Sequence, residues 1–243
     1  MAVYLGSNPI SVYGGGISIK DSGQYVWAKY EVAVPYLSFI GNEDFTLKTA
    51  NTTKNWNGTL EYSTDTSTWN IWDGITTISS SENKLYLRGT DNTKICYYYL
   101  NINSDEETFG NFIFTGTDNL KIACEGNIEN LLDYKTVSAG GHPAMTNECY
   151  TGMFQGCTSL TTAPELPATS LANFCYGYMF QGCTNIKLST TQTGDYQTAY
   201  RIPTSGSGTT ATEALINMFA STGGTFTGTP SINTTYYTSN TVV

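Results

Sequence analysis

A twelve-residue stretch that occurs twice constrains the fold of this chain more than any other feature of its sequence. Residues 149–160, CYTGMFQGCTSL, recur as residues 175–186, CYGYMFQGCTNI, at an offset of 26 residues. Met145 and Leu171 extend the match upstream at the same offset. A fixed period of this length is typical of a solenoid, in which each copy buries its apolar face only against its neighbours.

Each copy is expected to form a short helix, a tight turn and a brief strand. Apolar residues recur at every fourth position, which predicts one buried stripe along a helix. Gly156 and Gly182 follow at the point where a helix often ends in a left-handed residue. Residues 160–164 and 186–189 then predict short strands. The stripe consists of Met145, Cys149 and Met153 in the first copy and of Leu171, Cys175 and Met179 in the second.

A third, degenerate copy is expected near the C-terminus. Residues 190–212 are polar and Gly-rich and predict a long loop, after which residues 214–219 restore the helix pattern. Residues 226–230 take the place that residues 160–164 have in the first copy. Three copies reach the number that stable stacking needs. The predicted repeat core comprises Met145, Cys149, Met153, Leu160, Leu171, Cys175, Met179, Ile186 and Met218.

The first copy carries a family resemblance. Residues 153–169, MFQGCTSLTTAPELPAT, resemble the BspA-type leucine-rich repeat, which occurs in bacterial surface proteins and in phage and prophage proteins of gut Firmicutes and Bacteroidetes. The resemblance implies an interaction scaffold without naming a partner, and it covers at most the C-terminal half of the chain. Residues 3–7, VYLGS, with the glycines at 14–16, also resemble the N-terminal segments of some phage virion proteins.

Short strand-forming segments separated by turns fill residues 32–100. The turns contain Asn-Gly and Asp-Gly, the dipeptides that favour tight hairpins. Strands at this spacing predict a β-sandwich of immunoglobulin size, although the Cys-Trp-Cys framework of antibody domains is missing. Residues 112–114 and 120–124 close the sandwich or begin the repeats, and residues 125–132 predict a short capping helix. The strands are expected at residues 36–40, 45–47, 60–63, 75–78, 84–87 and 96–100.

We therefore expect a mainly β protein with short helices, in which an N-terminal immunoglobulin-like β-sandwich precedes a short BspA-type leucine-rich-repeat solenoid. Residues 1–30 form an N-terminal segment with predicted strands at 17–19 and 25–28, either an anchor fitted onto a partner or a plain hairpin with a loose loop. The β-sandwich domain is expected over residues 31–117. The leucine-rich-repeat-like domain, with its degenerate last copy, is expected over residues 118–243.

The charge of the chain excludes some classes of partner. Charged residues make up only 13% of the chain, and the net charge is −9. Binding to nucleic acid or to an anionic membrane needs clustered Lys and Arg, so we expect neither nucleic-acid binding nor membrane insertion. The N-terminus lacks the basic and apolar regions of a secretory signal. A surface-type protein of this kind has had its signal removed, uses another export route, or leaves the cell inside a particle released by lysis.

The six cysteines are expected to be reduced and buried. No Cys-x-x-Cys occurs and the only histidine is His142, which argues against a zinc site. Stacked helices lie about 8–10 Å apart, which is too far for a disulfide between Cys149 and Cys175. Cys157 and Cys183 are expected to lie nearer to one another, so a bridge between them stays open. A ladder of free cysteines packs as small hydrophobic residues.

No residue pattern predicts catalysis, a metal or a cofactor. The sequence lacks the Gly-x-Ser-x-Gly and phosphate-loop motifs, and His142 is interpreted as an ordinary loop histidine. Carboxylates are numerous enough for some pair to lie close together, but no spacing indicates a glycosidase. Asp65, Asp73, Asp91 and Asp105 lie in predicted loops without the arrangement of a calcium-binding loop.

Four aromatic residues are the strongest sequence-based candidates for ligand contact. Trp56, Tyr62, Trp69 and Trp72 lie within seventeen residues of predicted loop and strand. Exposed aromatic rings beside Asn and Asp hold sugars by stacking on their apolar faces. The alternative is that these rings fill the sandwich core or a subunit interface.

Two classes of function remain. The leading hypothesis is a non-enzymatic phage virion protein, a head or tail decoration or fibre, that contacts other virion proteins and displays a repeat surface for host attachment. We also expect a homo-oligomer. The alternative is a bacterial cell-surface adhesin that binds glycoproteins or glycans. A glycan-degrading enzyme is a third and weaker hypothesis.

Overall fold

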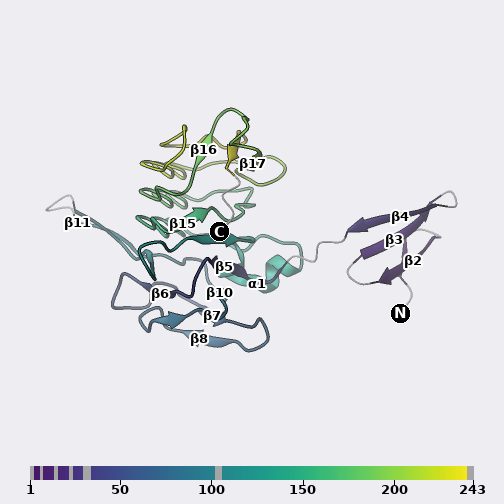
Figure 1. Ribbon diagram of the computed structural model, residues 1–243, viewed down its shortest axis with the longest axis horizontal. Coiled ribbons are helices and arrows are strands. Elements are labelled where there is room, and N and C mark those ends of the chain that lie inside the picture. The colour runs from purple at the N-terminus through teal and green to yellow at the C-terminus, as the bar shows by residue number, and fades with distance from the viewer. Residues whose placement is uncertain are drawn as a thin grey trace. The chain divides into compact units, whose positions relative to one another are not determined.

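The computed structural model describes residues 3–5, 8–13, 16–21, 24–29, 34–101 and 106–239, divided between two compact units, Met1–Val34 and Pro35–Val243. The first unit is a four-stranded antiparallel sheet in which each strand pairs with the next along the chain (Figure 1). The strands expected at residues 17–19 and 25–28 lie within its last two strands. The four strands are β1 (Val3–Leu5), β2 (Asn8–Tyr13), β3 (Gly16–Asp21) and β4 (Gln24–Lys29).

Two sheets form the lower part of the larger unit, and the chain is mainly β, as predicted. The larger sheet has the order β15-β14-β5-β10-β7-β8, and the smaller one has the order β13-β6-β9. The larger sheet contains β5 (Leu37–Gly41), β7 (Thr59–Ser63), β8 (Asn70–Trp72), β10 (Lys84–Thr90), β14 (Ile122–Glu125) and β15 (Leu160–Thr162). The smaller sheet contains β6 (Thr46–Thr49), β9 (Ile78–Ser79) and β13 (Phe112–Thr115).

Aromatic side chains fill the space between these two sheets. Buried and partly exposed residues alternate along β5 and β10, so one face of the larger sheet is apolar. Phe39 of β5 meets Phe112 and Phe114 of β13, with ring centroids 6.4 and 5.1 Å apart. Trp72 of β8 meets Phe112 at 5.7 Å. The two sheets therefore share one hydrophobic core, which continues into the repeats.

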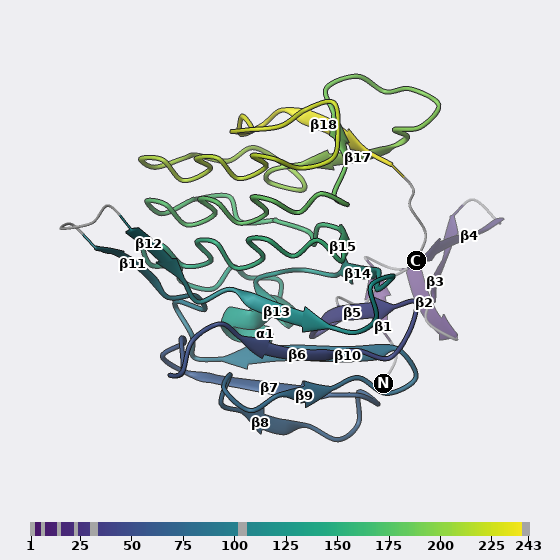
Figure 2. The same ribbon diagram turned by 60° about the vertical axis from the view of Figure 1, so that its left-hand side comes forward.

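The repeats form three stacked coils above the sheets (Figure 2). We name residues 148–157 the first coil, 174–183 the second coil and 213–222 the third coil. Even-numbered N–H groups of the first coil donate to carbonyl oxygens of the second, and those of the second donate to the third. In the first two coils, odd-numbered N–H groups donate three residues back, as in Cys157 to Phe154. In the third coil the even-numbered N–H groups do so, as in Met218 to Leu215. This alternation satisfies the backbone donors of a coil without a helix or a continuous strand.

The prediction that each repeat contains a short helix is wrong. The described residues contain one helix, α1 (Asn130–Ser138), and the coils instead consist of successive tight turns. A left-handed residue occurs at every fourth position, and both a helix and this turn repeat bring apolar residues to one side about every four residues. The left-handed residues are Glu148, Gly152 and Gly156 in the first coil, Phe174, Tyr178 and Gly182 in the second, and Glu213, Asn217 and Ser221 in the third.

Stacked aromatic rings run through the centre of the coils. The Phe154 and Phe180 rings lie 5.5 Å apart and 4° from parallel, and Phe180 and Phe219 follow at 5.3 Å and 16°. Tyr150 and Tyr176 stack at 5.6 Å. Phe180 and Phe219 occupy equivalent places in the second and third coils and are 39 residues apart in sequence. The third repeat predicted around Met218 therefore joins the stack without a helix.

Smaller elements complete the larger unit. A hairpin of β11 (Tyr98–Asn101) and β12 (Glu106–Phe109) stands out from the body, as both ribbon views show. A sheet of order β16-β18-β17 lies beside the upper coils and contains β16 (Leu188–Ser189), β17 (Thr198–Arg201) and β18 (Thr235–Thr238). The helix expected over residues 125–132 begins only at Asn130.

The expected domain boundary at residues 117 and 118 falls inside one sheet. Strand β14 follows this boundary, pairs antiparallel with β5 from the predicted β-sandwich, and pairs parallel with β15 from the predicted repeats. Residues on both sides of the boundary therefore share a sheet as well as a core.

Candidate functional site

The structure separates the four aromatic residues that the sequence brings together. Trp56 and Trp72 are buried, with exposed fractions of 3% and 1%, and their rings meet at 5.4 Å. Tyr62 pairs with Leu87 of β10 and packs partly buried against the core. Only Trp69 lies on the opposite face of the larger sheet, beside Arg88. Trp56, Tyr62 and Trp72 thus belong to the core side, which was the alternative interpretation.

Trp69 belongs to a cluster built around Arg88. The Arg88 guanidinium lies 4.0 Å from the centre of the Trp69 ring and 4.5 Å from that of Tyr134. Its Nε donates to Glu61 on the neighbouring strand at 2.9 Å. Tyr36 contacts the Trp69 ring at 5.9 Å. The guanidinium is thus held between two aromatic faces and a carboxylate, an arrangement that stabilises the sheet surface.

A groove of about 770 Å³ opens on the strand side of the coils. We call it the strand-side groove. Its walls come from β14 and β15 on one side and from β17 and β18 on the other. The Tyr200 hydroxyl donates to the Pro164 carbonyl at 3.2 Å and so ties β17 to the segment after β15. Burial raises the pKa of Tyr200 well above its usual value.

The strand-side groove combines an apolar floor with charges of both signs. Apolar side chains such as Ala163 and Ile186 line it, as do backbone and threonine groups of the flanking strands. Glu125 and Glu165 belong to the side of the larger sheet, whereas Lys187 and Arg201 belong to the side of β16 and β17. Such a surface suits an extended peptide better than a small anionic or cationic ligand.

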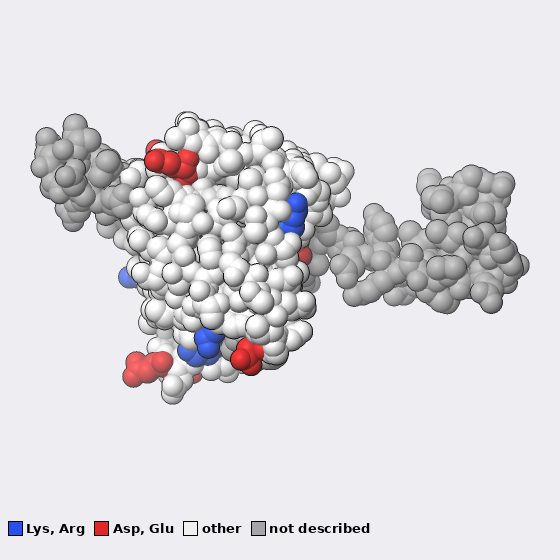
Figure 3. All heavy atoms as spheres, turned by 90° about the horizontal axis from the view of Figure 1, so that it is seen from above, with Lys and Arg blue, Asp and Glu red and all other residues white. Residues whose placement is uncertain are grey.

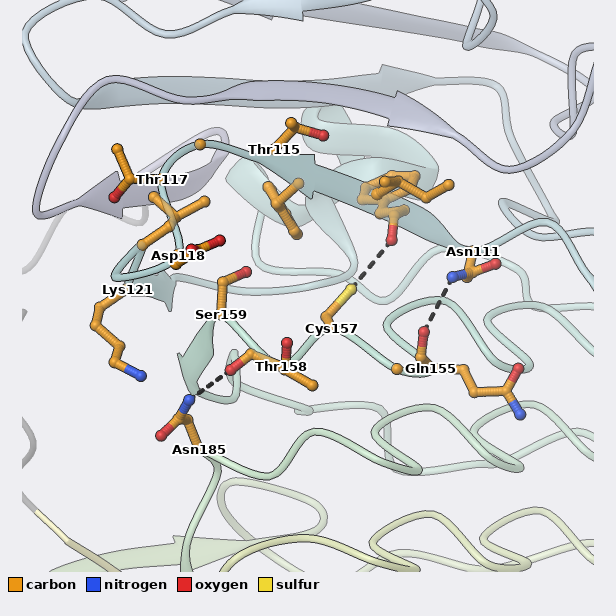
Figure 4. A pocket seen from close by; sticks show the side chains of 16 residues that line it. Asn111, Thr115, Thr117, Asp118, Lys121, Gln155, Cys157, Thr158, Ser159 and Asn185 are labelled. Carbon is orange, nitrogen blue, oxygen red and sulfur yellow. Dashed lines mark hydrogen bonds between the residues drawn. The ribbon is translucent and has the colours of Figure 1, made fainter.

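A second hollow of about 410 Å³ lies between β13 and the end of the first coil, and we call it the coil-end pocket. In Figure 4, Asp118, Lys121 and Ser159 lie at one end, Asn111 and Gln155 lie at the other, and Cys157 lies between them. The lining contains seven uncharged polar residues, namely Asn111, Thr115, Thr117, Gln155, Thr158, Ser159 and Asn185.

All six cysteines are free and buried, as the sequence interpretation favoured. Cys157 and Cys183 do not form the disulfide that the sequence left open. Their thiols instead donate to the carbonyls of Phe112 and Phe154 in the layers below, at 3.0 and 2.9 Å. Burial raises the pKa of Cys183 to about 12. Because the thiolate is the reactive form, these cysteines are poor nucleophiles in the folded protein.

His142 pairs with a buried carboxylate. Its Nδ1 lies 2.8 Å from Glu129 Oε2, and the His142 side chain is 47% exposed whereas that of Glu129 is 1% exposed. Burial raises the pKa of Glu129, and the hydrogen bond to His142 partly opposes this shift. The pair connects the loop before the first coil to the start of α1.

Charge is sparse on the upper end of the stack. Figure 3 shows that this face carries few charged side chains and that they lie near its margins. Glu213 is the only charged residue between residues 202 and 243. The segment from residue 202 to residue 239 is rich in threonine, serine and glycine.

Neither a metal centre nor a membrane span is found in the described residues. No group of three or more His, Cys, Asp or Glu in that part of the chain could hold a metal ion. No helix there has the length and apolar character that crossing a membrane requires. Comparisons with protein-family models, curated proteins and solved structures found no match to this chain.

Proposed function

We propose that the protein is a non-enzymatic structural protein of a phage virion, a head or tail decoration or fibre that presents an interaction surface. In this proposal the larger unit is an immunoglobulin-like β-sandwich that continues into a short BspA-type leucine-rich-repeat solenoid. The shared core of the two facing sheets supports the first part, and the three hydrogen-bonded coils support the second.

The strand-side groove is the observation that carries the proposal. One wall belongs to the sheet that contains β14 and β15, the other belongs to the sheet that contains β17 and β18, and the hydrogen bond from Tyr200 to Pro164 joins them, so the groove is formed before any partner arrives. A preformed surface loses little conformational entropy on binding. Its mixed charges and apolar floor suit an extended segment of another protein, either a neighbouring virion protein or a receptor on the host.

The cysteines support assembly in a reducing compartment. Disulfides are common in exported proteins and rare in cytoplasmic ones. Six buried free thiols fit a protein that folds in the host cytoplasm, where virions assemble, better than one that folds during export. This favours the virion hypothesis over the cell-surface adhesin.

The proposal is tested by quantitative mass spectrometry of purified phage particles from a culture that carries the gene, with the cell-envelope fraction as the comparison. Abundant peptides in the particles are expected, and their copy number distinguishes a head decoration from a tail fibre. Peptides confined to the cell envelope would refute the virion proposal and support the adhesin.

A further inference from the structure

We propose that the coil-end pocket binds a neutral saccharide. The strand-side groove shares no lining residue with this pocket, so the inference concerns a second surface. It does not depend on a virion location, because saccharide binding is a property of the isolated protein.

The lining favours a polyhydroxylated, uncharged ligand over other classes. A phosphate or other anion needs several cations, and Lys121 is the only one in the pocket. A hard metal ion needs several oxygen ligands that include carboxylates, and Asp118 supplies the only carboxylate. Hydroxyl and amide side chains, which both donate and accept, match sugar hydroxyls, which do the same.

Hydrogen bonds to the backbone hold the amide side chains in place. Asn185 Nδ2 donates to the Thr158 carbonyl at 2.5 Å, and Asn111 Nδ2 donates to the Gln155 carbonyl at 2.9 Å. These bonds use the amide nitrogens and leave the two Oδ1 atoms available. Within the described residues, no hydrogen bond to the protein engages either Oδ1 or the Ser159 hydroxyl. The pocket therefore offers fixed and unused polar groups.

The loop at the charged end of the pocket is held from the turn after β5. The Thr117 N–H donates to Glu43 Oε1 at 2.6 Å, and its hydroxyl donates to Oε2 at 2.9 Å. Asn42 donates to the Asn119 carbonyl and accepts from the Lys121 N–H, at 3.1 and 2.8 Å. These four bonds fix the loop that carries Asp118, so the pocket keeps its shape without a ligand.

An apolar wall completes the pocket. Phe114 lines it and is held by Phe39 and Phe45, whose ring centroids lie 5.1 and 5.9 Å away. Leu120 lines the pocket beside it. The C–H face of a pyranose packs against such a surface while its hydroxyls reach the polar groups opposite. An open pocket of this size holds one or two sugar rings and suits the tip of a longer glycan.

The test is saturation-transfer NMR on the full chain with the methyl glycosides of glucose, galactose, N-acetylglucosamine and N-acetylgalactosamine. We expect saturation transfer from the protein to at least one of these glycosides. The double variant S159A/N185A loses one hydroxyl and one amide, so its affinity for that glycoside should fall about tenfold or more. The matched control is T184A, which removes an exposed side chain from the same turn without altering the lining.

A second measurement uses the unmodified protein and so does not depend on the folding of a variant. Amide chemical shifts should move on titration with the bound glycoside, and the movement should be largest at Asn111, Ser159 and Asn185. Absence of transfer to all four glycosides would overturn the proposal, as would shifts confined to the strand-side groove or to Trp69. Particle mass spectrometry is unaffected by either result, so the two proposals fail separately.

Discussion

Replacing Phe180 tests whether the stack of aromatic rings holds the coils together. Its ring is fully buried between Phe154 and Phe219, at 5.5 and 5.3 Å. Both centroid distances lie within the range of about 4.5–7 Å that favourable aromatic pairs adopt, and both pairs are near-parallel. Phe180→Ala loses burial, leaves a cavity and breaks both pairs.

The expected loss of stability comes from the buried volume of the ring and from its stacking. Truncation of a buried Phe to Ala costs about 3–5 kcal/mol in free energy of unfolding. Phe180→Leu keeps much of the apolar volume but removes two stacked pairs, each of which contributes about 0.5–1.5 kcal/mol. We therefore expect Phe180→Leu to lose about 1–3 kcal/mol by this reasoning. Phe219→Leu should lose a similar amount, because Phe219 stacks on Phe180 and also meets Tyr200 edge-on, and both geometries are favourable for aromatic pairs.

The measurement is urea unfolding followed by circular dichroism, with stability taken from the midpoint at an unchanged slope. A double-mutant cycle of Phe180→Leu and Phe219→Leu should give a coupling energy of about 0.5–1.5 kcal/mol. Additivity of the two changes within about 0.3 kcal/mol would refute the stacking argument, because the rings would then act only as apolar volume.

Three further predictions concern the coils and the buried ionisable groups. Gly152→Ala should destabilise more than Gly156→Ala in urea unfolding, because both residues have positive φ but only at Gly152 would the new Cβ lie 2.1 Å from the Phe109 ring; equal losses would contradict this packing. Ellman's reagent at pH 8 should label none of the buried cysteines in the native protein and all six in urea, and fast native labelling would contradict the burial. Burial raises the pKa of Glu129 in the folded state, so the folded protein retains a proton that the unfolded chain releases. Stability should therefore fall as pH rises from the ordinary glutamate pKa of 4.5 through the raised value. Unfolding measurements on Glu129→Gln should show a flatter decline of stability with pH, and an unchanged decline would assign the effect to other groups.

The sequence predicts the period of the repeats but not their local conformation. Apolar residues at every fourth position fit a helix and a four-residue turn repeat equally well. The left-handed residue that distinguishes the two occupies equivalent places at Gly152, Tyr178 and Asn217, with φ of +63°, +57° and +49°. A glycine in the middle of a predicted helix argues against the helix, because glycine is a poor helix former. Only the first copy has a glycine at this position, namely Gly152, so the sequence contains little sign of the turns.

The candidate sites depend on contacts that no local pattern reveals. Strand β8 was not predicted, so the sequence could not show that Trp72 pairs with Leu60 on the core side while Trp69 lies on the other face. The coil-end pocket joins residues 111–121 to the end of the first coil, and Glu43 fixes its loop from 74 residues away. Hydrogen bonds between residues so far apart produce no periodic pattern in the sequence, so they could not be predicted from it.

The hydrogen bonds from the first coil to the second and from the second to the third repeat one pattern of two complementary faces. One face presents amide donors toward the following layer, and the other presents carbonyl acceptors toward the preceding one. A duplicated segment of 26 residues can thus enter between existing layers without altering its neighbours, whereas an odd number of residues inserted within a coil would exchange the two classes of N–H group. The 13 additional residues between the second and third coils lie in the connecting segment, where they leave this order intact. The architecture therefore allows the protein to lengthen by gene duplication in whole layers and confines other length changes to the connections.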